Sequence, residues 1–166
     1  ASKLSKTIAL AEGTDVRAAK AAEILTQKNV CKVVLIGNED EIKSKFPEID
    51  FSGVSFDDPK TSEHRAEYAN TLYELRKAKG MTEEQAFNIV TTNNMFYACV
   101  ALKRGDVDGV VGGAVFSSAD VSRAAFQVIK AAPGISSVSS CFVMVPPEDF
   151  KYKKYPAYIF SDCAVI

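Results

Sequence analysis

Residues 105–123 read GDVDGVVGGAVFSSADVSR, and this stretch decides how the chain folds. Its apolar segment, 107–111, predicts a short buried strand that runs into Gly112-Gly113 and then a hydroxyl-rich turn. Apolar residues recur beyond the turn with helical spacing, so a helix follows, with Ser118 predicted as its N-cap. A glycine turn that leads into a helix leaves backbone N–H groups unpaired. The stretch therefore predicts a binding place for an anion.

Strands and helices alternate along the rest of the chain. Further apolar strands are predicted at 7–10, 31–36, 54–56, 137–145 and 157–160. Helices are predicted between them, the longest over 62–79 with Gly80 as its end. This alternation predicts an α/β fold, with a mostly parallel sheet flanked by helices. We expect residues 1–145 to form one α/β domain and residues 146–166 to begin a second, truncated one.

Composition excludes several classes of partner. Of the 166 residues 47% are hydrophobic, which is enough for a domain with a core of its own. Twenty basic residues balance 21 acidic ones, so we expect no nucleic-acid partner and no attraction to a membrane surface. No apolar run approaches the roughly 18 residues that span a bilayer, and no signal peptide is recognisable. The four cysteines lack metal-ligand spacing. We expect a cytoplasmic protein without a metal site.

The predicted anion site draws on five residues of the opening stretch. Gly112 and Gly113 would let the backbone approach a ligand, and the hydroxyls of Ser117 and Ser118 could donate to it. Arg123 lies opposite the apolar stripe of its helix and could reach back toward the helix start. An ordinary strand–turn–helix with a solvated arginine explains the same spacing, and spacing alone leaves both readings open. The two common nucleotide-binding glycine motifs are absent.

Two other arginines are candidates on weaker grounds. Arg76 lies near the end of the long predicted helix, where it could enter a cleft or only favour the helix C-terminus. Arg17 follows the first predicted strand, whose carboxyl end is where open α/β sheets bind ligands.

Five segments in the same order resemble the phosphate acetyltransferase family. The opening stretch resembles the family's signature segment. The other four are IALAEGTDVR at 8–17, YELRKAKG at 73–80, QVIKAAPG at 127–134 and FSDCAV at 160–165. Together they span almost the whole chain. The resemblance implies an N-terminal portion of such an enzyme, with a three-layer αβα sandwich as its first domain.

The resemblance also implies a reaction and a set of contacts. The family transfers an acetyl group reversibly between acetyl phosphate and coenzyme A, releasing inorganic phosphate. Arg123 and Arg76 match family arginines that would bind the phosphoryl group, supported by Ser117, Ser118 and the backbone of Gly112 and Gly113. The proposed catalytic base lies beyond Ile166 in the family. No cofactor is implied, since coenzyme A is a substrate, and the full-length form is expected to be a homodimer.

Two alternatives stay open. Phe116 stands where the family commonly has histidine. The altered turn could suit a longer acyl group, as in a phosphate butyryltransferase. The chain could also be a non-catalytic ligand-binding module of the same fold, like the related domain of some malic enzymes.

Overall fold

A computed structural model describes residues 5–135 and 140–161 of the chain. The chain divides into two compact units, residues 1–130 and 131–166, which we describe separately. Among the described residues, no helix is both long enough and apolar enough to cross a bilayer.

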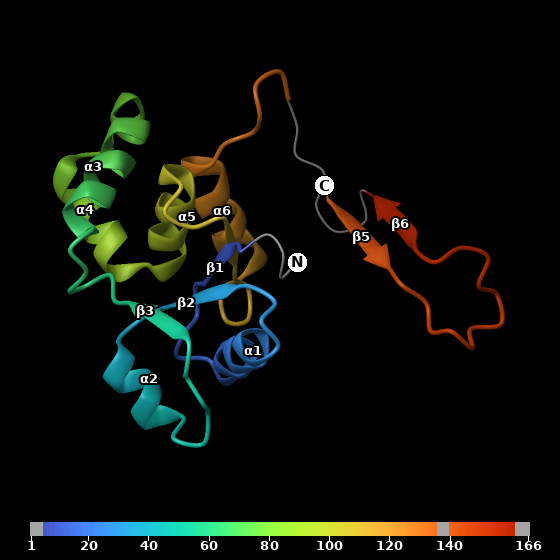
Figure 1. The fold of residues 1–166 in the computed structure, drawn as a ribbon. Coiled ribbons are helices and arrows are strands. Elements are labelled where there is room, and N and C mark those ends of the chain that lie inside the picture. Colours follow the sequence, from blue (N-terminus) through green and yellow to red (C-terminus); the bar gives the residue numbers. More distant parts are fainter. Residues whose placement is uncertain (1–4, 136–139, 162–166) are drawn as a thin grey trace. The chain divides into compact units, whose positions relative to one another are not determined.

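The first unit is built on a four-stranded parallel sheet (Figure 1). Its strands lie in the order β3-β2-β1-β4, with bounds β1 Thr7–Leu10, β2 Lys32–Ile36, β3 Val54–Asp57 and β4 Gly109–Val111. All the pairings are parallel. The order runs outward from β1 to β3 on one side and jumps to β4 on the other. The sheet therefore has a topological switch point between β1 and β4, and ligands bind open α/β sheets at such points.

Alternation along the strands gives the sheet two apolar faces. Leu10, Val33 and Leu35 point to one face and pack with α1 (Val16–Gln27) and α2 (Glu39–Lys45). Ala9, Ala11 and Ile36 point to the other. There they pack with α3 (Arg65–Arg76), α4 (Glu83–Thr92), α5 (Asn94–Arg104) and α6 (Ser118–Val128). Helices thus cover both faces, and the predicted three-layer α/β sandwich is confirmed.

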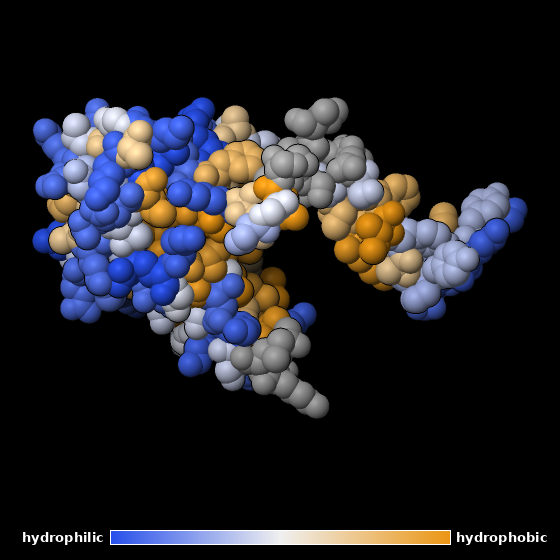
Figure 2. Space-filling view, turned by 90° about the horizontal axis from the view of Figure 1, so that it is seen from above, coloured by the Kyte–Doolittle hydropathy of each residue, from blue (hydrophilic) through white to orange (hydrophobic). Residues whose placement is uncertain are grey.

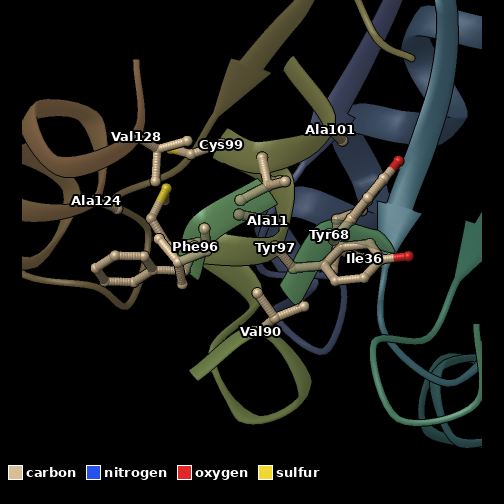
Figure 3. Close-up of a cluster of buried hydrophobic side chains, with 14 of the residues drawn as sticks. Ala11, Ile36, Tyr68, Val90, Phe96, Tyr97, Cys99, Ala101, Ala124 and Val128 are labelled. Carbon is tan, nitrogen blue, oxygen red and sulfur yellow. The ribbon is translucent and has the colours of Figure 1, made fainter. Parts of the chain in front are cut away.

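Helix α5 is the centre of the larger core (Figure 3). Phe96 and Cys99 lie on its α6 side, near Ala124 and Val128. Tyr97 lies on its other side, where its hydroxyl donates to the Asp57 carboxylate at the end of β3, 2.7 Å away. Packing on one side and a hydrogen bond on the other fix α5, and α5 leads directly into β4 through Gly105.

Local sequence signals set most helix ends correctly. Thr82 and Gln85 form a capping box at the start of α4, and Gly105 ends α5 with a left-handed φ of 87°. The helix predicted over 62–79 is shorter, because the Ser62 hydroxyl accepts from the His64 amide and holds residues 62–64 in a turn. Its last residues, Lys77–Lys79, form a 3₁₀ helix (η2) that stops at Gly80, as predicted.

The second unit contains a β-hairpin. Strand β5 (Cys141–Met144) pairs antiparallel with β6 (Tyr158–Ser161), and both strands lie within this unit. The domain bounds expected from the sequence, 1–145 and 146–166, stay a prediction. Hydrophobic side chains of both strands are exposed, as Figure 2 shows on the surface of the hairpin. With the loop between the strands they line an apolar pocket of about 510 Å³.

Candidate functional site

Residues 105–123, the opening stretch of the sequence analysis, contain β4, which lies beside the first strand of the sheet. Strands β1 and β4 are parallel neighbours, and the amide of Ala11 donates to the carbonyl of Val111 at 3.0 Å. The turn after β1 and the turn after β4 therefore meet at the carboxyl edge of the sheet. This is the switch point, and a small cavity of about 180 Å³ there is lined by Glu12, Arg17 and Gly112 together with neighbouring apolar residues.

The backbone amides of residues 113–116 already have an acceptor within the protein, the side chain of Glu12. Glu12 is only 7% exposed, and its carboxylate accepts four consecutive backbone N–H groups. One oxygen accepts from Gly113 (2.9 Å) and Ala114 (2.8 Å), and the other accepts from Val115 (2.5 Å) and Phe116 (2.7 Å). The expectation that these amides wait for a substrate anion is corrected, because each already has a charged acceptor.

This hydrogen bonding keeps Glu12 ionised. Burial alone would raise the pKa of its carboxyl, but the four backbone N–H groups outweigh burial and lower the pKa below its ordinary value of about 4.3. A lowered folded-state pKa contributes stability that is fully present above the unfolded-state pKa. That stability is lost as pH falls through the folded-state pKa.

We therefore expect Glu12 to make the first unit acid-sensitive. In urea unfolding followed from pH 7 to pH 3, the stability difference between the wild type and the Glu12→Gln variant should shrink below about pH 4.3. Glu48→Gln is the matched control, because Glu48 is exposed and the structure gives it no hydrogen bond. Its difference from the wild type should stay small throughout. A Glu12→Gln difference that is constant with pH would contradict the assignment.

Arg17 holds the same turn from the side of α1. Its guanidinium donates to both oxygens of Asp15, at 2.9 and 3.0 Å, and also to the carbonyl of Ala114. The hydrogen bond from the Arg17 side chain lowers the pKa of Asp15 to about 2. Asp15 is also the N-cap of α1, where it accepts from the Arg17 amide. Two side chains of opposite charge, Glu12 and Arg17, therefore connect the segment after β1 to the turn after β4 by hydrogen bonds.

The start of α6 differs by one residue from the prediction. Ser117, not Ser118, is the N-cap, because Ser117 has the extended backbone of a cap and its hydroxyl oxygen accepts from the Asp120 amide at 3.2 Å. The Ser117 hydroxyl donates to the Asp120 carboxylate at 2.6 Å, and Arg123 donates to the same carboxylate at 3.1 Å. Asp120 thus joins two of the predicted phosphate ligands. Ser118 is the first residue of the helix.

The two glycines of the stretch are required for different reasons. Gly113 has a φ of 109°, which side chains rarely tolerate. A Cβ on Gly112 would lie 2.0 Å from the Cε atom of Met95, which is buried in the larger core. Gly112 is therefore needed for close packing of α5 against the end of β4.

Arg76 is the one predicted ligand with an unmet requirement. It is the last residue of α3, and its Nε atom is buried without a hydrogen-bond partner among the described residues. The Arg76 side chain is partly exposed, but a buried N–H donor left without an acceptor costs free energy. The structure shows no hydrogen bond between Arg76 and Ser117, Asp120 or Arg123. It brings together the candidates on the 112–123 stretch and leaves Arg76 on a separate helix.

Sequence reasoning missed Glu12 as a functional residue. The signal was present, since an acidic residue two positions after the last residue of an apolar strand and directly before a glycine is an unusual choice at a sheet edge. What the sequence did not give was the strand order. Only the pairing of β1 with β4 brings Glu12 to the amides of 113–116.

Comparisons with known proteins agree over the whole chain. The family model "Phosphate acetyl/butaryl transferase" matches residues 1–166. A phosphate acetyltransferase of Acetivibrio thermocellus is 47% identical over 161 residues, covering 97% of this chain and 48% of the relative. A phosphate acetyltransferase of Thermoanaerobacterium thermosaccharolyticum is 41% identical over 160 residues, covering 96% of this chain and 48% of the relative.

A solved structure gives the same result for the fold. The EutD phosphotransacetylase from Staphylococcus aureus superimposes with a TM-score of 0.85 at 32% identity, covering 98% of this chain and 47% of that one. The chain thus spans about half the length of the relatives it matches. With a family model that matches every residue and a shared α/β sandwich, the chain belongs to the phosphate acetyl/butyryl transferase family.

Proposed function

We propose that this chain supplies the phosphate-binding side of an acetyltransferase that acts between acetyl phosphate and coenzyme A. The observation that carries the proposal is the family match over residues 1–166, together with relatives named phosphate acetyltransferase. Two features of the site support it. Arg76 has a buried Nε with no partner, and Arg123 makes one exposed ion pair, counting for both the described residues alone.

The reaction requires positively charged groups around the phosphate, because the leaving phosphate carries negative charge that they stabilise. The thiolate sulfur of coenzyme A attacks the acetyl carbonyl carbon, a C–S bond forms, and the C–O bond to the phosphate breaks. Inorganic phosphate leaves with the electron pair of that bond. The thiol proton passes to a base, which the resemblance places beyond residue 166. Guanidinium groups suit the leaving phosphate, because their planar N–H pairs match its oxygens.

The chain's residues take the following roles in this proposal. Arg123 and Arg76 bind the phosphoryl oxygens. Ser118 and the exposed side of Ser117 assist them, while Gly112 and Gly113 act indirectly, because they let the chain pack against Met95 and turn from β4 toward α6. Since Glu12 occupies the amides of 113–116, the charge on the phosphate is met by side chains rather than by that backbone.

The remaining family expectations belong to the same proposal. The enzyme would need no cofactor, would act in the cytoplasm and would assemble as a homodimer. Light scattering on the natural gene product that contains these residues tests the dimer directly.

The deciding experiment measures acyl transfer. The natural gene product that contains these 166 residues should form acetyl-CoA from acetyl phosphate and coenzyme A, with release of one phosphate per thioester. The 166-residue chain alone should be inactive or nearly so. Butyryl phosphate is assayed in parallel, and a higher kcat/KM for it than for acetyl phosphate would favour the butyryltransferase alternative. Binding of acetyl phosphate without any transfer would favour the non-catalytic module and overturn the proposal.

A further inference from the structure

Glu12 is the most unusual charged side chain in the described structure. Of the residues described in the first unit, it is the one charged residue that is buried, and four backbone donors converge on it. The reaction outlined above gives it no part, because a carboxylate next to a phosphate site would repel the substrate. Its position therefore needs an explanation of its own.

The geometry shows what both carboxylate oxygens do. Each oxygen accepts two N–H groups, so the side chain offers four acceptor positions to four donors in a row. An amide of the same shape has only one oxygen and would place an NH₂ group against two N–H donors. The site is therefore specific for a carboxylate and not only for a side chain of this size.

The turn that Glu12 holds leads directly into the proposed phosphate ligands. The last donor, Phe116, is followed at once by Ser117, the N-cap of α6, and Ser117 and Arg123 share the Asp120 carboxylate. Arg17 fixes the carbonyl of Ala114 in the same turn from α1. Any shift of residues 113–116 moves the start of α6.

We propose that Glu12 is a positioning residue, an anion built into the protein that shapes the 113–116 turn and thereby places the start of α6 for substrate phosphate. The carboxylate takes the site that a free oxyanion would occupy at the sheet switch point. Substrate phosphate is thus kept off these amides and directed to the side chains of α6. The placement of substrate phosphate rests on the proposed function; the role of Glu12 in the turn does not.

Two variants separate a charged acceptor from a space-filling side chain. Glu12→Gln keeps the shape and Glu12→Ala removes it. We expect both to lower the melting temperature of the 166-residue chain by about 5 °C or more, because unsatisfied buried donors are costly in either case. Glu48→Gln, at an exposed position, should change it by less than about 1 °C. A Glu12→Gln melting temperature equal to that of the wild type would overturn the proposal.

Anion rescue tests the second part of the proposal, that the Glu12 carboxylate occupies a site that a free oxyanion could take. In Glu12→Ala the four amides lose their acceptor, so formate or inorganic phosphate should raise the melting temperature in a saturable way, beyond its effect on the wild type at equal ionic strength. An identical response of variant and wild type would show that these amides are no anion site and would overturn this part.

Kinetics on the natural gene product tests the positioning role. Glu12→Gln should raise the KM for acetyl phosphate about tenfold and leave the KM for coenzyme A within about twofold. Equal rises in both constants would point to general loss of structure and contradict the role. If no acetyl transfer is found even in the wild type, the proposed function fails, while the thermal and rescue measurements still decide the role of Glu12 in the turn.

Discussion

Replacing Arg123 with alanine in the natural gene product will lower kcat/KM for acetyl phosphate by about 100-fold, with little change in the KM for coenzyme A. A guanidinium that makes two charge-assisted hydrogen bonds to a phosphate stabilises it by an amount of this order. The loss should be specific to the phosphate substrate. Initial rates measured with one substrate varied and the other saturating give both constants.

The fold should survive this change. The ion pair between Arg123 and Asp120 is exposed on both sides, and exposed pairs of this kind contribute little to stability. The melting temperature should therefore stay within about 2 °C of the wild type. Lys20→Ala is the matched control, because Lys20 is an exposed cation on α1, outside the proposed site. If Arg123→Ala keeps its dependence on acetyl phosphate, the assignment of Arg123 is wrong.

The sequence predicted the architecture well, because the signals were local. Buried strands showed as apolar runs, and helix ends were marked by residues such as Thr82, Gly80 and Gly105. Their alternation was enough to predict a parallel sheet covered on both faces. One difference is local: the Ser62 hydroxyl accepts from the His64 amide, two residues further on, and shortens α3. The pairing of β5 with β6, by contrast, depends on contact between segments far apart in the chain.

The site was predicted less completely for a related reason. The glycine turn and the cap of α6 are features of one segment, and the sequence predicted both to within one residue. The occupant of the turn comes from Glu12, about a hundred positions away, and it arrives only through the pairing of β1 with β4. Spacing within a segment indicates that backbone amides converge. It does not indicate which acceptor reaches them.

Replacing Arg76 with methionine should raise stability and remove activity at the same time. The Nε of Arg76 is buried without a partner among the described residues, so the folded chain bears the cost of a desolvated, unsatisfied donor. An apolar side chain of similar length removes that cost, and we expect a melting temperature about 2 °C higher. A binding group kept at the expense of stability is typical of functional sites. In the natural gene product, kcat/KM for acetyl phosphate should fall about 100-fold.

Arg65 at the other end of α3 is the matched control. Its guanidinium donates to the carbonyls of Thr61 and Ser62, at 3.0 and 2.8 Å, so it is satisfied where Arg76 is not. Arg65→Met should lower the melting temperature, because two acceptors lose their donor, and should leave the KM for acetyl phosphate unchanged. The opposite signs of the two stability changes make the comparison sharp. If Arg76→Met is destabilised like Arg65→Met and still uses acetyl phosphate normally, Arg76 has a structural role and the phosphate is bound without it.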